Sequence, residues 1–226
     1  MLSDFISLIF PRVCAACGNS LYKNEEVICT NCNYHLPKTN FHLQQENQLS
    51  KKFWGRIKIE NAAAYYHFKK DSGVQHILHN LKYNGQKEVG TAVGKLYGKE
   101  LLESVLFKTI DLIIPVPLHP KKKKKRGYNQ SDFFAEGLSK SMSVEWSADT
   151  LLRNVANESQ TKKTRFNRWQ NVESIFQLKD ENKIAGKHIL LVDDVVTTGS
   201  TLEASAEELL KTDGTKISIA TIACTY

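Results

Sequence analysis

No hydrophobic run in this sequence is long enough to cross a bilayer, because every apolar stretch falls short of the ~20 residues that a spanning helix requires. The apolar start, residues 1–11, carries an acid where a signal peptide has its basic region, and no small-residue cleavage site follows it. We therefore expect a cytoplasmic protein without a transmembrane segment. The start itself is interpreted as a short helix docked on the body, with peripheral contact at the inner membrane as the alternative.

Internal repeats and low-complexity tracts are also absent, apart from one run of five lysines. Hydrophobic residues make up 41% of the 226 positions and charged residues 24%, which is typical of a globular protein. The formal net charge is +7, and the surplus is concentrated in two blocks, residues 121–126 and 162–168. Such blocks suit pyrophosphate or a nucleic-acid backbone. For the lysine run, a solvated loop is the alternative.

Cysteine is scarce beyond residue 32, but the first 32 residues hold four of the five cysteines as two C-x-x-C pairs. The pairs are Cys14 with Cys17 and Cys29 with Cys32. Two close pairs joined by a short hairpin can bring four thiolates round one tetrahedral Zn²⁺, whose binding would supply folding energy that so small a segment lacks. Disulfides are the competing interpretation, but no export signal accompanies the pairs. The sequence therefore predicts a structural zinc site.

The most informative stretch is residues 189–201. Four apolar residues, 189–192, predict a buried parallel strand. Asp193 and Asp194 follow, where open α/β sheets bind ligands, and their acceptor oxygens suit the vicinal diol of a ribose. The next polar group offers hydroxyls, backbone N–H groups and a helix N-terminus to one phosphate, and it consists of Thr197, Thr198, Gly199, Ser200 and Thr201. A capped strand-to-helix connection explains one acid and one threonine, but not this combination.

A second strand–loop–helix unit precedes it. Residues 111–117 predict a short buried strand closed by prolines, followed by a loop with the lysine run and then a helix through residue 138. Arg126 can grip two phosphate oxygens at once, and Gly127 lets the backbone come close. We expect a second anion site here, with a basic surface turn as the alternative. Elsewhere the patterns predict a strand over 61–68, helices over 74–84 and 88–106, and a final strand over 217–224.

Residues 157–172 are polar and basic with scattered aromatics, and the stretch is long enough to be a functional loop. One interpretation is a lid that closes over a phosphorylated ligand. Another is a track for single-stranded nucleic acid, with Phe166 or Trp169 stacking on bases. A third is that Trp169 and Phe176 pin the loop to the core. The sequence leaves these three open.

Five groups of residues occur in a characteristic order and cover nearly the whole chain. They are the four early cysteines, Leu81-Lys82-Tyr83-x-Gly85, Pro115-Val116-Pro117-Leu118-His119 with Arg126-Gly127-Tyr128-Asn129-Gln130, Gln160 with Arg168 and Asn171, and Leu191-Val192-Asp193-Asp194-Val195-x-Thr197-Thr198-Gly199-x-Thr201. In this order they resemble the ComF family, in which a four-cysteine zinc finger precedes a type I phosphoribosyltransferase domain. Two departures, Lys163 and the run 121–125, make the loops more basic than the family pattern.

The resemblance implies an α/β fold of the type I phosphoribosyltransferase class, with a central, mostly parallel sheet flanked by helices and a small N-terminal zinc ribbon. The expected organisation is a short helix plus zinc finger over 1–36, a linker over 37–56 and the phosphoribosyltransferase-type domain over 57–226. It also implies binding of 5-phosphoribosyl 1-pyrophosphate (PRPP) with Mg²⁺. Asp193 and Asp194 would hold the ribose hydroxyls and act in catalysis, and residues 197–201 would hold the 5′-phosphate. The pyrophosphate loops would contribute Arg126, Gly127, Gln160, Arg168 and Asn171.

The family further implies a role in natural competence, in the handling of incoming single-stranded DNA. We expect a Mg²⁺-dependent phosphoribosyltransferase in which a nucleophile displaces pyrophosphate from C1 of the ribose. The sequence does not identify the acceptor substrate that carries this nucleophile. One alternative is a nucleic-acid-binding competence factor whose PRPP site is regulatory. Another is an adaptor that docks a helicase or a channel component.

Overall fold

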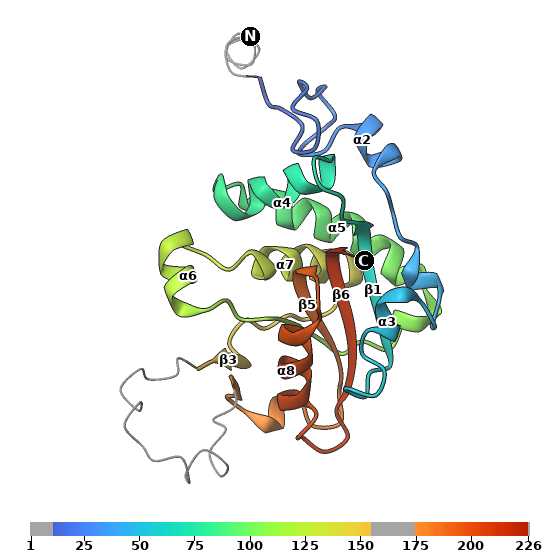
Figure 1. Ribbon diagram of the computed structural model, residues 1–226, viewed down its shortest axis with the longest axis vertical. Coiled ribbons are helices and arrows are strands. Elements are labelled where there is room, and N and C mark those ends of the chain that lie inside the picture. Colours follow the sequence, from blue (N-terminus) through green and yellow to red (C-terminus); the bar gives the residue numbers. More distant parts are fainter. Residues whose placement is uncertain (1–10, 155–174, 226) are drawn as a thin grey trace.

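The computed structural model describes residues 11–154 and 175–225. Its centre is a sheet of four parallel strands in the order β1-β6-β5-β2 (Figure 1). The strands are β1 (Asn61–His67), β2 (Leu112–Pro115), β5 (His188–Val196) and β6 (Lys216–Cys224). Because all four run in one direction, their carboxyl ends meet at one edge, at the top in Figure 1. The predicted α/β class with a central parallel sheet is confirmed.

The central strand β5 is covered on both faces, which explains its unbroken apolar run. Residues Ile189 to Val192 are 0% exposed. Helices α5 (Lys87–Glu103) and α7 (Gln130–Met142) lie behind the sheet, and α8 (Ser200–Leu209) lies in front of it (Figure 1). The predicted strand ends at Val192, but pairing with β6 continues to Val196. The acid pair therefore lies within the strand rather than after it.

Helix α4 (Gly73–Tyr83) forms where the helical spacing predicts it. Ser72 caps its start by accepting a hydrogen bond from the Gln75 N–H (3.4 Å), which satisfies one of the free amides of the first turn. Its buried side chains are Val74, Ile77, Leu78 and Leu81. Gly85 has a φ of 70° and allows the sharp turn from α4 into α5.

Helices α5 and α7 approach each other closely because glycines face each other at Gly94 and Gly137. A Cβ atom added to Gly94 would lie 2.8 Å from the Cα of Gly137 and would also meet the carbonyl of Phe134. No side chain fits between the two backbones there. This contact fixes the position of α7, whose N-terminus reaches the acid pair on β5.

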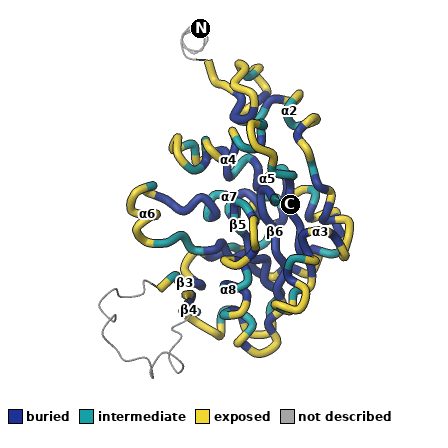
Figure 2. The backbone as a smooth tube through the Cα atoms, in the orientation of Figure 1, coloured by how far each residue is buried: buried dark blue, intermediate teal, exposed yellow. Residues whose placement is uncertain are grey.

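The lysine run forms a helix, α6 (Pro120–Arg126), where the sequence predicts a loop. Pro120 stands at the first helical position, which suits its fixed φ, and the His119 ring accepts a hydrogen bond from the Lys121 N–H (3.2 Å). Lysine is itself a good helix former. Gly127, with a φ of 83°, ends the helix. The helix projects from the body and is largely exposed (Figure 2).

Residues 37–56, predicted to be a polar linker, pack on the domain. They contain the 3₁₀ helix η1 (Phe41–Leu43) and the helix α3 (Gln48–Lys51). Asn47 caps α3 and also donates a hydrogen bond from its side chain to the Ala62 carbonyl of β1 (2.8 Å). Phe53 is 0% exposed. The hydrophobic residues of this polar segment are enough to order it against the sheet edge.

The remaining described elements are short. They are α2 (Thr30–His35), η2 (Val105–Phe107), η5 (Glu181–Lys183) and an antiparallel pair formed by β3 (Leu151–Arg153) and β4 (Phe176–Leu178). Among the described residues, no helix is long and apolar enough to span a membrane. The expected helix at residues 1–11 falls almost wholly outside the described part of the chain.

Candidate phosphoribosyl site

The loop between β5 and α8 has the features of a phosphate site. Gly199 adopts a φ of 83° and lets the chain turn directly from the strand into the helix. The N-cap residue Gly199 supplies no side-chain hydrogen bond to the first turn of α8, and the Ser200 N–H donates to Thr198 Oγ1 (3.4 Å). This amide-rich, partially positive helix end suits an anion. Hydroxyl groups surround it, with Thr198 Oγ1 lying 3.1 Å from Ser200 Oγ. Asp193 and residues 195–202 line a small hollow at this turn.

The acid pair sits beside this loop and is held by two helices behind it. Asp193 Oδ1 accepts hydrogen bonds from Ser131 Oγ of α7 (2.9 Å) and from the Asp194 N–H (2.8 Å). Asp194 is 4% exposed, and one of its carboxylate oxygens lies 3.0 Å from Lys82 Nζ at the end of α4. Desolvation and the neighbouring Asp194 charge raise the pKa of Asp193 to about 7, and Ser131 and Lys82 oppose that rise.

The predicted pyrophosphate loop lies next to this site because β2 pairs with β5, with Pro115 opposite Val192. Asn129 begins α7 and ties it to the end of β2 through a hydrogen bond to the Val116 carbonyl (3.1 Å). The Arg126 side chain donates to Gln130 Oε1 and lies 5.6 Å above the Tyr83 ring. A cavity of about 430 Å³ lies here, and it is lined by Lys82, Tyr83, Gly85, Lys122, Lys125, Arg126 and Tyr128.

Three residues of the expected site, Gln160, Arg168 and Asn171, lie outside the described residues, as do Phe166 and Trp169. The lid, the nucleic-acid track and the pinned loop therefore all remain predictions. The structure brings together the acid pair, residues 197–201 and the start of α7, because all three lie at the carboxyl ends of the adjacent strands β2 and β5.

Sequence reasoning missed four residues that touch the expected site. Lys82 belongs to a motif to which the sequence assigns no role, and Ser131 carries no signal of its own. Lys52 and Arg56 contact the loop between β5 and α8 from the segment predicted to be a linker. Contacts between residues so far apart in sequence leave no local pattern, so only the tertiary structure identifies them.

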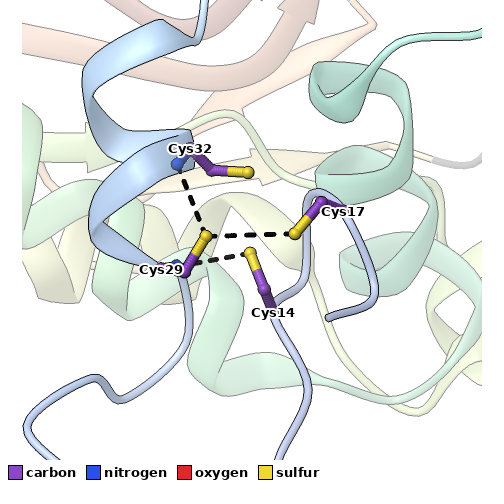
Figure 3. A group of neighbouring side chains, drawn as sticks. All are labelled: Cys14, Cys17, Cys29 and Cys32. Carbon is purple, nitrogen blue, oxygen red and sulfur yellow. Dashed lines mark hydrogen bonds between the residues drawn. The ribbon is translucent and has the colours of Figure 1, made fainter. Parts of the chain in front are cut away.

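The second candidate site is the cysteine cluster. The Sγ atoms of Cys14, Cys17, Cys29 and Cys32 all lie within 4.8 Å of one another (Figure 3). Two backbone amides donate hydrogen bonds to these sulfurs. The Cys29 N–H donates to Cys14 Sγ (3.3 Å), and the Cys32 N–H donates to Cys29 Sγ (3.4 Å). Burial disfavours the Cys14 thiolate, but N–H groups of Cys29, Cys17 and Ala16 outweigh it and lower the pKa of Cys14 to about 7. Four converging sulfurs fit a soft, tetrahedral ion such as Zn²⁺.

Comparisons with known proteins agree with this fold. The profile of the phosphoribosyl transferase domain family matches residues 121–225, which contain both loops and the acid pair. A solved structure of glutamine PRPP amidotransferase from B. subtilis aligns with 64% of this chain and 30% of its own, at 18% identity and a TM-score of 0.46. An adenine phosphoribosyltransferase structure aligns with 66% of this chain and 74% of its own, at 18% identity and a TM-score of 0.39. The profile match assigns residues 121–225 to a phosphoribosyl transferase domain.

Relatives that align with most of this chain indicate a more specific group within this domain class. DNA utilization protein YhgH of Shigella flexneri is 29% identical over 211 residues, which cover 92% of this chain and 88% of the relative. Competence protein ComFC of Bacillus subtilis is 28% identical over 207 residues, covering 84% and 81%. Competence protein F of Haemophilus influenzae is 34% identical over 106 residues, covering 46% of each chain. Together with the domain match, these relatives support a ComF-family protein.

Proposed function

We propose that this protein binds PRPP with Mg²⁺ at the edge formed by β5 and β2. The single observation that carries the proposal is the acid pair on β5, followed within one short loop by hydroxyl side chains and the N-terminus of α8. Asp193 and Asp194 would accept hydrogen bonds from the ribose hydroxyls. Residues 197–201 would bind the 5′-phosphate, and the loop around Arg126 and Gly127 would bind the pyrophosphate.

The chemistry proposed for this site is transfer of the phosphoribosyl group. The C1–O bond to pyrophosphate breaks as a bond forms between C1 and a nucleophile of the acceptor, and the electron pair leaves with the pyrophosphate. Mg²⁺, held by the ligand's phosphates and few protein carboxylates, would neutralise charge on the leaving group. The chain's own contribution is to orient the ribose through the acid pair and to place Arg126 near the departing phosphates. The four-cysteine cluster is proposed to hold a structural zinc ion.

Titration of PRPP and Mg²⁺ into the protein by calorimetry tests this proposal. We expect saturable binding by the wild type and a loss of at least about a hundredfold in affinity for Asp193→Ala/Asp194→Ala, because each of the two acids removed costs about 1.5–3 kcal/mol of hydrogen bonding to a ligand. The control is Asp213→Asn, which removes an exposed acid after α8 and should leave the affinity unchanged. Absence of wild-type binding, or equal binding by the double variant, contradicts the proposal.

A second function, handling of single-stranded DNA, is favoured by α6. This helix presents five consecutive lysines, all exposed, next to the proposed site. Such a surface can bind a phosphate backbone without reading sequence. The relatives' names, which refer to DNA utilization and competence, support the same proposal. Here PRPP would act as substrate or as regulator of a DNA-binding protein.

We expect single-stranded oligonucleotide affinity to fall steeply with salt. Lys123→Gln/Lys124→Gln should make the log–log salt dependence shallower by about 0.7 for each DNA phosphate that the variant no longer neutralises. The matched control, Lys69→Gln/Lys70→Gln, removes the same charge from an exposed pair before α4. Fluorescence anisotropy at several salt concentrations gives the affinity and the slope of its salt dependence. Binding that is absent, or equally affected by both pairs, argues against α6 as a DNA surface. Co-purification with a partner protein alone would then favour an adaptor.

A further inference from the structure

Residues 52–56 form a turn that contacts residues 197–201, called the phosphate loop below. This turn lies outside the 121–225 profile match. Lys52 directly follows α3, and its Nζ donates hydrogen bonds to the Thr197 carbonyl (2.7 Å) and the Thr225 carbonyl (2.7 Å). Arg56 donates from Nη1 to the Thr198 carbonyl (3.1 Å) and to the Lys52 carbonyl (3.1 Å). Two consecutive carbonyls of the loop are therefore held by cationic side chains from one turn.

Phe53 and Glu203 complete this contact. The Phe53 ring lies against Gly199, where an added Cβ atom would be 3.0 Å from Phe53 Cε1. Gly199 is thus needed both for its positive φ and for space above the ring. Arg56 Nε also donates to Glu203 Oε1 (3.0 Å) in the first turn of α8. The same arginine therefore bridges the loop and the helix that follows it.

Holding these carbonyls fixes where the loop amides point. A trans peptide is planar, and its C=O and N–H groups point in opposite directions. When Lys52 and Arg56 bind the carbonyls of Thr197 and Thr198, the N–H groups of Thr198 and Gly199 are turned away from the α3 side. A loop with its amides already oriented loses less conformational entropy when a phosphate binds.

We propose that Lys52, Phe53 and Arg56 are positioning residues that preorganise the phosphate loop. This inference rests on the proposed function, since the loop's ligand is taken to be the 5′-phosphate of PRPP. It extends that function to residues before β1, none of which lies within the 121–225 match. The segment predicted to be a linker is on this account a working part of the site.

Calorimetric titration of Lys52→Met with PRPP–Mg²⁺ and, separately, with pyrophosphate–Mg²⁺ tests the role in binding. We expect PRPP affinity to fall about tenfold, and pyrophosphate affinity, which depends on the Arg126 loop, to stay within twofold. Lys52→Arg keeps a donor and should restore part of the loss. The control Lys51→Met removes the same charge from the neighbouring exposed residue, whose amine lies over the Trp54 ring (5.6 Å), and should leave both affinities unchanged. Equal losses for both ligands, or for both lysine variants, overturn the proposal.

Backbone ¹⁵N relaxation in the ligand-free protein tests the preorganisation itself. The order parameters of the Thr198 and Gly199 N–H groups should be near the rigid value of about 0.85 in the wild type and fall below about 0.6 in Lys52→Met and in Arg56→Met, while β5 and β6 stay rigid. Unchanged order parameters at these two residues overturn the inference. This measurement needs no ligand, so a wild type that fails to bind PRPP would refute the proposed function and still leave the loop positioning decided.

Discussion

Removing the metal from the cysteine cluster is expected to unfold residues 11–36 while the central sheet stays folded. This segment has little apolar core of its own, so its order would come mainly from the ion, and structural zinc sites contribute about 10–16 kcal/mol. The segment also covers part of α4, because His76 Nδ1 lies 2.9 Å from the Ala16 carbonyl and Asn80 Nδ2 donates to the Ala15 carbonyl (3.0 Å). Its loss should therefore lower the Tm of the whole protein by about 5–10 °C.

The measurement is metal analysis and hydrogen exchange before and after a chelator. One zinc ion per chain is expected in the wild type, and chelation should release it together with the amide protection of residues 11–36. Cys14→Ser should lose the metal. Cys224→Ser makes the same substitution at a buried cysteine in β6, far along the chain from the cluster, and should keep one ion per chain. Full protection of residues 11–36 after chelation would contradict a structural role for the metal.

Asp193→Asn is expected to stabilise the protein at pH 8 and to have little effect at pH 4. Asparagine keeps the acceptor oxygen that Ser131 and the Asp194 N–H contact in the wild type, but it removes the charge that burial and Asp194 oppose. A pKa raised from 3.8 to about 7 corresponds to an upper bound of about 4 kcal/mol. Relaxation of the site reduces this, so we expect about 1–3 kcal/mol.

The direction follows from proton linkage. Below about pH 4 the carboxyl of Asp193 is protonated in both the folded and the unfolded states, so it contributes no difference. Between about pH 4 and 7 the unfolded chain has lost this proton while the folded protein retains it, and wild-type stability falls as pH rises. Above about pH 7 the destabilisation is complete. Asp193→Asn should therefore lack this loss.

Urea unfolding of wild type and variant at pH 4, 6 and 8 measures this difference. Asp213→Asn serves again as the exposed control. Its free energy of unfolding should differ from that of the wild type by the same amount at pH 4 and at pH 8. A constant difference between Asp193→Asn and wild type across the range would contradict the raised pKa. A destabilised acid at the centre of the proposed site fits a general pattern, because groups placed for ligand binding are often unfavourable for folding.

The same electrostatics bears on ligand binding. Hydroxyl donors of a ribose favour the ionised carboxylate, so the raised pKa of Asp193 should be lowered when PRPP binds. Lys82 already acts in this direction from the end of α4, because its charge lies 3.0 Å from Asp194. The Leu81-Lys82-Tyr83 stretch thus supplies a charge to the acid pair, which gives a physical role to a motif that the sequence marks only by its order.

Local sequence patterns determine a large part of this protein. The run Ile189–Val192 predicts β5 because a strand covered on both faces is apolar throughout. Helix α4 follows from its spacing and its cap. The two C-x-x-C pairs predict a four-sulfur cluster because ligand spacing is itself a local property. Gly199 marks the turn into α8 because few other residues adopt its backbone conformation.

Only the tertiary structure decides how the site is assembled around these elements. Pairing with β6 extends β5 through the acids, and packing of α7 on α5 brings Ser131 to Asp193. Residues 37–56 are polar enough to resemble a linker, yet Phe53 is buried and Lys52 reaches Thr197. These contacts join residues that lie 62 and 145 positions apart. The sequence by itself determines which chemical groups are present, because spacing and residue type are local. Which groups support the loop and set the charge of the acid pair depends on long-range contacts that only folding creates.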